Sequence, residues 1–205
     1  MITIEKILFL DKQQTGEEAQ RLTKEDIAFL VNLLSEKDDK IRYAALLLLQ
    51  SRSAGFSDVY PYWEVFLKKL NSENSYQRSI GLMLIAENAR WDTENRMEDA
   101  LDAYLEILHD EKPITVRQCI QALHRILPYK RHLAEKIADA LISLDMTTIR
   151  TTMRKSVLTD ILSVLAAVRK QLSSDKVDAY IAQALSTDVL DRKTIKEVEN
   201  MLTGK

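Results

Sequence analysis

The chain has 205 residues, 46% of them hydrophobic, and a formal net charge of −2 at pH 7. This composition fits a soluble protein that buries a core, and so small a net charge predicts neither a nucleic-acid partner nor a membrane surface. Glycine (4) and proline (3) are scarce, and helix-forming residues such as Leu, Ala, Glu, Lys and Arg fill most segments. The sequence therefore predicts an all-α chain.

Other features argue against a secreted or membrane-spanning protein. Cys119 is the only cysteine, so no internal disulfide can form. The N-terminal sequence MITIEKILFLDKQQ lacks the basic start and the small-residue cleavage site of a signal peptide. The longest apolar runs, Tyr43–Leu49 and Ile80–Ala86, have about a third of the roughly 20 residues that a spanning helix needs. We expect a cytoplasmic protein without membrane contacts.

In chain order, residues 1–22 are expected to form an N-terminal capping helix with a short continuation. Five pairs of amphipathic helices follow, each with a polar turn between its two helices. The first helices contain KEDIAFLVNLLS, PYWEVFLKKLN, MEDALDAYLEILHD, LAEKIADALISLD and SDKVDAYIAQALS; the second contain IRYAALLLL, QRSIGLMLI, VRQCIQALH, MRKSVLTDI and DRKTIKEVE. The predicted repeats span approximately 23–55, 56–91, 92–128, 129–170 and 171–205, within a single domain over residues 1–205.

Each second helix has an arginine near its predicted start. These arginines are Arg42, Arg78, Arg117, Arg154 and Arg192, at spacings of 36, 39, 37 and 38 residues. The fourth copy also contains Arg150, but Arg154 fits better because Val157, Leu158 and Ile161 then share an apolar face. A period of this length indicates repeats that bury one another's apolar faces.

The segment LSEKDDKIRYAA resembles a HEAT repeat, with an acidic turn followed by an apolar residue, an arginine and a small residue. The third copy, LHDEKPITVRQC, fits with one extra turn residue. The resemblance to the HEAT-like, armadillo-type superfamily implies a right-handed α-α superhelix, or solenoid, of about five helix pairs. It also implies that each arginine reaches an acidic turn residue. The candidates are Glu36 or Asp38 for Arg42, and Asp110 or Glu111 for Arg117.

Glycine and proline positions add detail to these repeats. Gly81 falls inside a helix, where glycine costs about 1 kcal/mol relative to alanine, so we expect a neighbouring helix to approach it closely. Gly16 and Gly55 are expected in connections, Pro113 at the start of a helix and Gly204 at the end of the last one.

The resemblance also implies that the second helices line the concave, ligand-facing side. Residues 112–170 hold 11 Lys/Arg and 4 Asp/Glu, a net charge of +7. Where the first copy has Leu46 and Leu49, the third has Gln121 and His124. We predict a partner-binding surface, with another protein or an acidic peptide as the partner. Its residues are Arg117, Gln118, Gln121, His124, Arg125, Arg154 and Lys155. The alternative is that these charges only face solvent.

No motif in the sequence predicts catalysis, a metal or a cofactor. The phosphate-binding glycine loop, the zinc-binding HExxH and the nucleophile motif GxSxG do not occur. His109, His124 and His132 are not spaced as metal ligands, and Cys119 occupies a core position of its helix. We therefore expect no catalytic residues, no metal and no cofactor.

One alternative function is nucleic-acid binding. Some HEAT-like proteins are DNA glycosylases that excise alkylated bases, with a Trp followed four residues later by an Asp. Here the residue four positions after Trp91 is Asn95, which carries no negative charge. Asp92 directly follows Trp91 and would point about 100° away on a helix. The favoured function is a non-enzymatic protein–protein interaction scaffold or adaptor, of undetermined partner and oligomeric state. The alternative is a nucleic-acid-binding relative of these glycosylases.

Overall fold

The computed structural model describes residues 1–203, and within that range the chain forms twelve α-helices and no β-strand. The helices are α1 Ile4–Leu8, α2 Lys12–Arg21, α3 Lys24–Leu33, α4 Asp39–Ser53, α5 Trp63–Leu70, α6 Ser75–Asn88, α7 Arg96–Leu105, α8 Pro113–Ile126, α9 Ala134–Ser143, α10 Thr151–Arg169, α11 Asp175–Leu185 and α12 Arg192–Thr203. Short 3-10 helices are η1 Tyr60–Tyr62, η2 Ala89–Trp91, η3 Glu106–His109 and η4 Arg131–Leu133. Gly204, expected at the end of the last helix, lies outside the described residues.

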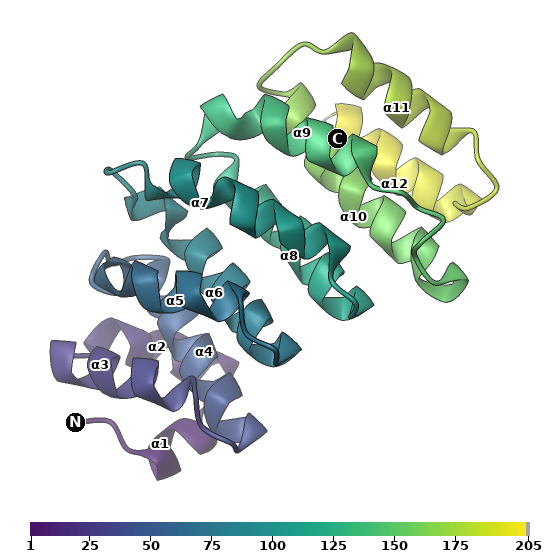
Figure 1. Cartoon of the computed structure of the whole chain (residues 1–205). Helices are drawn as coiled ribbons and strands as arrows, with labels where there is room; N and C mark the ends of the chain where they lie inside the picture. Colours follow the sequence, from purple (N-terminus) through teal and green to yellow (C-terminus); the bar gives the residue numbers. More distant parts are fainter. Residues whose placement is uncertain (204–205) are drawn as a thin grey trace. The chain divides into compact units, whose positions relative to one another are not determined.

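The element order confirms the all-α prediction of five helix pairs behind an N-terminal cap. The pairs are α3/α4, α5/α6, α7/α8, α9/α10 and α11/α12 (Figure 1). The chain divides into two compact units, Met1–Ala100 and a second that begins at Leu101, so the boundary falls within α7. A single domain over residues 1–205 stays a prediction, and each unit is described by itself.

The first unit is organised around α4, which contacts α1, α2, α3 and α6. Because neighbours cover α4 on several sides, its leucine run is largely buried: Leu46, Leu48 and Leu49 are each at most 3% exposed. Leu47 alone of the run remains 36% exposed.

The N-terminal cap differs in detail from the prediction. Residues 1–22 form two helices, α1 and α2, and Gly16 lies inside α2 rather than in a connection. The longer second helix, α2, has Asp11 as its N-cap, and the Asp11 side chain accepts a hydrogen bond from the backbone N–H of Gln14 in a capping box. The prediction that Gly16 lies in a connection is wrong because the capping box stabilises the start of α2 and a helix tolerates glycine at a cost of about 1 kcal/mol.

A buried arginine attaches the cap to the first repeat. The Arg52 guanidinium donates to the carbonyls of Ala19 and Gln20 at 3.0 and 2.9 Å, and to the Asp58 carboxylate at 2.6 Å. It also stacks on Phe56, 3.6 Å from the ring centroid. A guanidinium has five donors, so Arg52 can bind the carbonyls of α2 and the carboxylate of the loop after α4 simultaneously.

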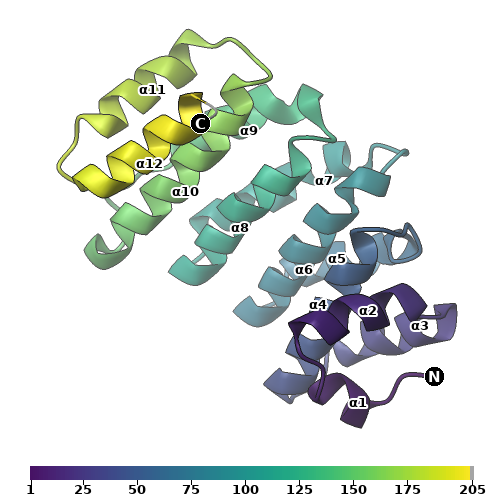
Figure 2. The ribbon, with the colours of Figure 1, turned by 180° about the vertical axis from the view of Figure 1, so that it is seen from behind.

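The second unit is organised around α10, which contacts α8, α9, α11 and α12 (Figure 2). Proline at the first position of α8 fits the predicted helix start at Pro113, since the first turn needs no N–H from that residue. Cys119 is fully buried in α8 and its thiol lies 3.4 Å from the Tyr104 carbonyl oxygen, which confirms its predicted core position.

Gly81 sits where α5 and α6 approach most closely. A Cβ added at this position would lie 2.6 Å from the Phe66 carbonyl oxygen and 3.1 Å from atoms of Leu70 and Lys69. The predicted close approach of a neighbouring helix is therefore present, and it explains why a residue of low helix propensity occupies the middle of α6.

Replacing Gly81 by alanine should destabilise the protein by about 1–3 kcal/mol, because the new methyl group forces α5 and α6 apart. Gly16→Ala is the matched control: nothing lies within 4 Å of an added Cβ there, so the substitution should stabilise α2 by up to about 1 kcal/mol. Urea denaturation of both variants measures the difference. Equal stability of Gly81→Ala and the parent chain would contradict the close contact.

Candidate functional site

The second helices of the repeats can be compared by counting from the N-cap residue of each helix. The N-caps of α4, α6, α8 and α10 are Asp38, Asn74, Lys112 and Arg150. Four residues further on stand Arg42, Arg78, Val116 and Arg154. The arginine repeat is therefore real in three copies, and the third copy has a valine at this position.

The three arginines tie each turn to its helix through backbone carbonyls. Arg42 Nη1 donates to the carbonyls of Glu36 and Lys37 at 2.6 and 2.9 Å. Arg78 donates in the same way to Ser72 and Glu73 at 2.7 and 3.0 Å. The carboxylate that pairs with Arg42 belongs to Asp39, not to the expected Glu36 or Asp38. We call this contact the arginine clamp.

Arg154 makes the same kind of contact in the fourth copy. Its Nε and Nη2 donate to the carbonyls of Ile149 and Thr147, both at 2.9 Å. The preference for Arg154 over Arg150 in the repeat register is therefore confirmed, because Arg150 is the N-cap residue of α10.

The third and fifth copies depart from the predicted register by a residue or more. Arg117 lies five residues after its N-cap, and the carboxylate to which it donates belongs to Asp160 of α10 instead of the expected Asp110 or Glu111. Arg192 is the first residue of α12 and thus precedes the clamp position. In the third copy the reason is the extra turn residue, because it places the helix start one residue further from the arginine than in the other copies.

Counting from the N-cap also shows which line of each second helix faces outward. On α8 this line runs through Ile114, Arg117, Gln118, Gln121, His124 and Arg125, all exposed or half-buried. On α10 it includes Lys155, which is exposed. Six of the seven predicted partner-binding residues therefore share equivalent faces of the neighbouring helices α8 and α10. The seventh, Arg154, is a clamp residue and points to its own turn.

The same count corrects one comparison between copies. Gln121 and His124 correspond to Leu47 and Gln50 of the first copy, not to the buried Leu46 and Leu49. Leu47 is itself 36% exposed, so this face is open in both copies and differs in polarity rather than in burial.

Ion pairs neutralise part of the predicted basic surface. Arg117 Nε lies 2.6 Å from Asp160 Oδ2, and Gln121 Nε2 donates to Asp160 Oδ1 at 3.1 Å. The hydrogen bond from Arg117 to Asp160 raises the pKa of the Arg117 guanidinium. Lys155 pairs with Asp191, and the hydrogen bond from Lys155 lowers the pKa of that carboxyl group. Asp160 is already counted in the net charge of +7 for residues 112–170, whereas Asp191 lies outside that stretch, so its pair with Lys155 lowers the charge offered to a partner below this value.

Two polar groups of α8 stand out on this face. The side-chain oxygen of Gln118 is buried and has no hydrogen-bond partner. His124 is exposed three residues beyond Gln121, on the same side of the helix. Sequence reasoning found both residues by their polarity, but only the structure shows that one of them holds an unsatisfied acceptor.

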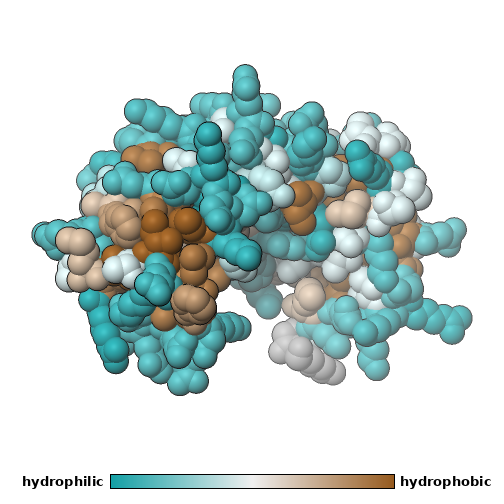
Figure 3. Space-filling model, turned by 90° about the horizontal axis from the view of Figure 1, so that it is seen from below, coloured by the Kyte–Doolittle hydropathy of each residue, from teal (hydrophilic) through white to brown (hydrophobic). Residues whose placement is uncertain are grey.

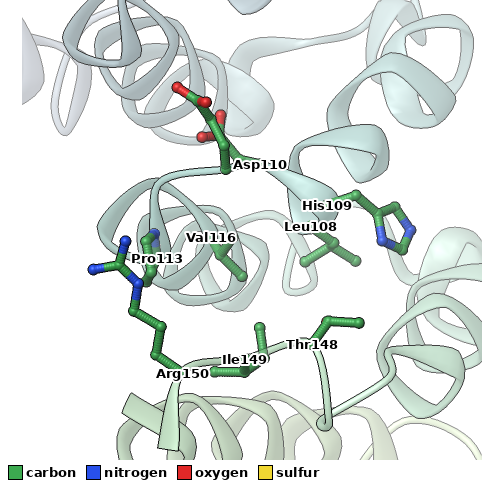
Figure 4. Close-up of a pocket in the computed structure, with 9 residues that line it drawn as sticks. Leu108, His109, Asp110, Pro113, Val116, Thr148, Ile149 and Arg150 are labelled. Carbon is green, nitrogen blue, oxygen red and sulfur yellow. The ribbon is translucent and has the colours of Figure 1, made fainter. Parts of the chain in front are cut away.

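A cleft of about 340 Å³ lies between the turns of the third and fourth repeats. Figure 4 shows Leu108, Val116 and Ile149 turned toward the middle of this cleft, with Arg150 reaching along its edge toward Pro113. Val116 holds the position that an arginine clamp fills in other copies. The cleft is therefore floored by apolar side chains where the other turns have a guanidinium.

Trp91 and Asp92 are occupied by structural contacts. Trp91 Nε1 donates to the Ser53 carbonyl at 2.7 Å. The Asp92 carboxylate accepts from the backbone N–H groups of Arg96 and Met97, both at 2.9 Å, and from the Tyr60 hydroxyl at 2.8 Å. Burial and this hydrogen bond to Asp92 raise the pKa of Tyr60. The carboxylate therefore orders the start of α7.

Among residues 1–203, no group of three or more His, Cys, Asp or Glu side chains is arranged to hold a metal ion. None of the helices in that range combines the length and the apolar character needed to cross a bilayer.

Comparison with known proteins defines the fold. No protein-family model and no curated protein matches the sequence. The structure is similar to a designed armadillo repeat protein in complex with the peptide (KR)4, with a TM-score of 0.65 and 14% identity over 98% of this chain and 89% of that chain. It is also similar to computationally designed armadillo repeat proteins for modular peptide recognition, with a TM-score of 0.61 and 16% identity over 98% and 90% of the two chains. The chain is thus an armadillo- or HEAT-like α-solenoid, as its repeats predict.

The free energy of unfolding of two variants distinguishes a clamp residue from a residue of the outward line. Arg154→Met should destabilise the second unit by about 1–2 kcal/mol, because two turn carbonyls lose a charged donor. Lys155→Met should change stability by less than about 0.5 kcal/mol, since its pair with Asp191 is largely exposed. Chemical denaturation measures both. A larger loss of stability for Lys155→Met than for Arg154→Met would contradict the assignment of Arg154 as the clamp residue and of Lys155 as an outward residue.

Proposed function

We propose that this chain is a non-enzymatic scaffold that binds another protein or a peptide through the outward lines of its second helices. The observation that carries the proposal is the face of α8 and α10. It combines exposed polar groups, an unsatisfied buried acceptor at Gln118 and the half-buried Arg117–Asp160 pair. Partly desolvated polar groups of this kind suit hydrogen bonding to a peptide.

The designed relatives support a peptide as the partner. One was solved with the peptide (KR)4, and others were designed for modular peptide recognition. At 14% and 16% identity these proteins share the fold with this chain, so the contacts of this chain must come from its own residues.

Exposed apolar side chains of the first unit favour a protein partner over a nucleic acid. Figure 3 shows hydrophobic residues gathered in a patch among hydrophilic ones. The contacting helices α1 and α4 leave Leu8, Tyr43 and Leu47 exposed by 42, 62 and 36%. Contiguous apolar surface is typical of protein interaction sites, whereas a phosphate backbone is bound by cations.

The charge of the partner is proposed from the exposed residues of the α8 face. Arg117 and Lys155 pair with carboxylates, and Arg154 is used by the clamp. Arg125 adds an exposed positive charge to the same face. An acidic peptide remains the proposed partner, with Arg125 and the donors of Gln121 and His124 as its contacts.

Affinity capture from native lysate, with and without nuclease, tests this function. Arg125→Glu should lose the captured protein, because it reverses the charge of the proposed face. Lys196→Glu, an equal charge change at an exposed position of α12, should retain it. Circular dichroism should show unchanged helicity in both variants.

Two outcomes would contradict the proposal. Equal capture by both variants would remove the α8 face from binding. Capture that disappears with nuclease, together with salt-dependent retention on DNA, would favour the nucleic-acid alternative. A direct comparison of Glu-rich and (KR)4 peptides by fluorescence anisotropy then tests the sign of the partner's charge, with the Glu-rich peptide expected to bind more tightly.

A further inference from the structure

The first unit contains a cleft equivalent to that of Figure 4, between the turns of its first and second repeats. This cleft has a volume of about 640 Å³. Its lining includes the clamp residue Arg42 and the N-cap residue Asn74, which stand at the same positions as Val116 and Arg150 in the cleft of the second unit. We call it the first inter-turn cleft.

Lys69 is the unusual residue of the first inter-turn cleft. It is only 9% exposed, yet its ammonium group donates to two neutral acceptors, Ser35 Oγ at 3.1 Å and Gln77 Oε1. Within the described part of the chain, no carboxylate lies within ion-pair distance of its Nζ. A lysine ammonium has three donors, so one remains for a further acceptor.

Further cations surround this buried ammonium. Lys37, Arg42 and Lys68 also line the cleft, whereas Glu36 is the only acidic residue of the lining. Asp39, which pairs with Arg42, is 72% exposed and does not line the cleft. Burial and, secondly, repulsion from Arg42 lower the pKa of Lys69. With Arg42 paired to Asp39, the three lysines against Glu36 leave a local charge of +2, in a unit whose 13 Lys/Arg and 17 Asp/Glu give a net charge of −4.

A buried cation without a counter-charge costs free energy, and an anion in the cleft would remove that cost. The available donors are the third N–H of Lys69 and the ammonium group of Lys68, with the hydroxyl groups of Ser35 and Ser72 close by. A doubly charged tetrahedral oxyanion matches this set better than a single carboxylate, because it offers several acceptors and two negative charges.

We propose that the first inter-turn cleft binds a phosphate group, with Lys69 as its central ligand. This site is separate from the α8 face and does not depend on the proposed scaffold function. The equivalent cleft of the second unit carries Val116, Asp110 and Glu111 in its lining and therefore lacks the same preference for an anion.

Isothermal titration calorimetry with inorganic phosphate, at ionic strength matched with chloride, tests the site. Wild-type protein should bind phosphate, and Lys69→Met should weaken binding by about tenfold or more, because a charge-assisted hydrogen bond is lost. Lys12→Met removes an exposed lysine outside the cleft and should bind within about twofold of wild type. O-phosphoserine and acetate serve as further titrants.

The outcomes distinguish the possibilities. If O-phosphoserine binds more tightly than inorganic phosphate, the natural ligand of the cleft is a phosphate group on a phosphorylated partner. If inorganic phosphate binds more tightly, the ligand is the free ion. Equal binding by Lys69→Met and wild type, or no phosphate binding, would overturn the proposal, as would acetate binding as tightly as phosphate. If Lys69→Met fails to fold, Lys68→Met provides the second variant, with weakened phosphate binding expected and unchanged binding counting against the site.

Discussion

The arginine clamp joins three of the five second helices, α4, α6 and α10, to the turns that precede them. In α4, α6 and α10 the guanidinium four residues after the N-cap holds the carbonyls of the preceding turn. The carbonyls of a turn have no partner within the helix that follows, and the guanidinium supplies charged donors for them. The clamp therefore stabilises the helix start, and the position of that start decides which residues face outward.

The third repeat shows what changes when the clamp is absent. Val116 occupies the clamp position, so Arg117 is turned away from its own turn and joins α8 to Asp160 of α10. The cleft at this turn has Val116 in place of a clamp arginine, among both apolar and charged lining residues. The next residue, Arg117, thus links two helices on the proposed partner face.

Charge in this protein is decided by pairing more than by composition. The basic stretch 112–170 is partly neutralised by Asp191, which lies outside it, whereas the first unit, with 13 Lys/Arg and 17 Asp/Glu, contains a buried lysine without a carboxylate. A local excess of charge has a larger effect in a desolvated cleft than on an exposed face, because water screens exposed charges. Counting charges along the chain therefore gives a poor guide to where an anion would bind.

The sequence by itself determined the all-α class, the five helix pairs, the buried Cys119 and the close contact at Gly81, because apolar periodicity and residue size act locally. Six of the seven candidate residues, chosen by their polarity and the HEAT-like resemblance, lie on equivalent faces of α8 and α10. It did not reveal the partners of Arg117, the two-helix cap or the cleft around Lys69. Those depend on which turns and helices are neighbours in space, and a one-residue change in turn length, which shifts a helix face by about 100°, is decided only by tertiary packing.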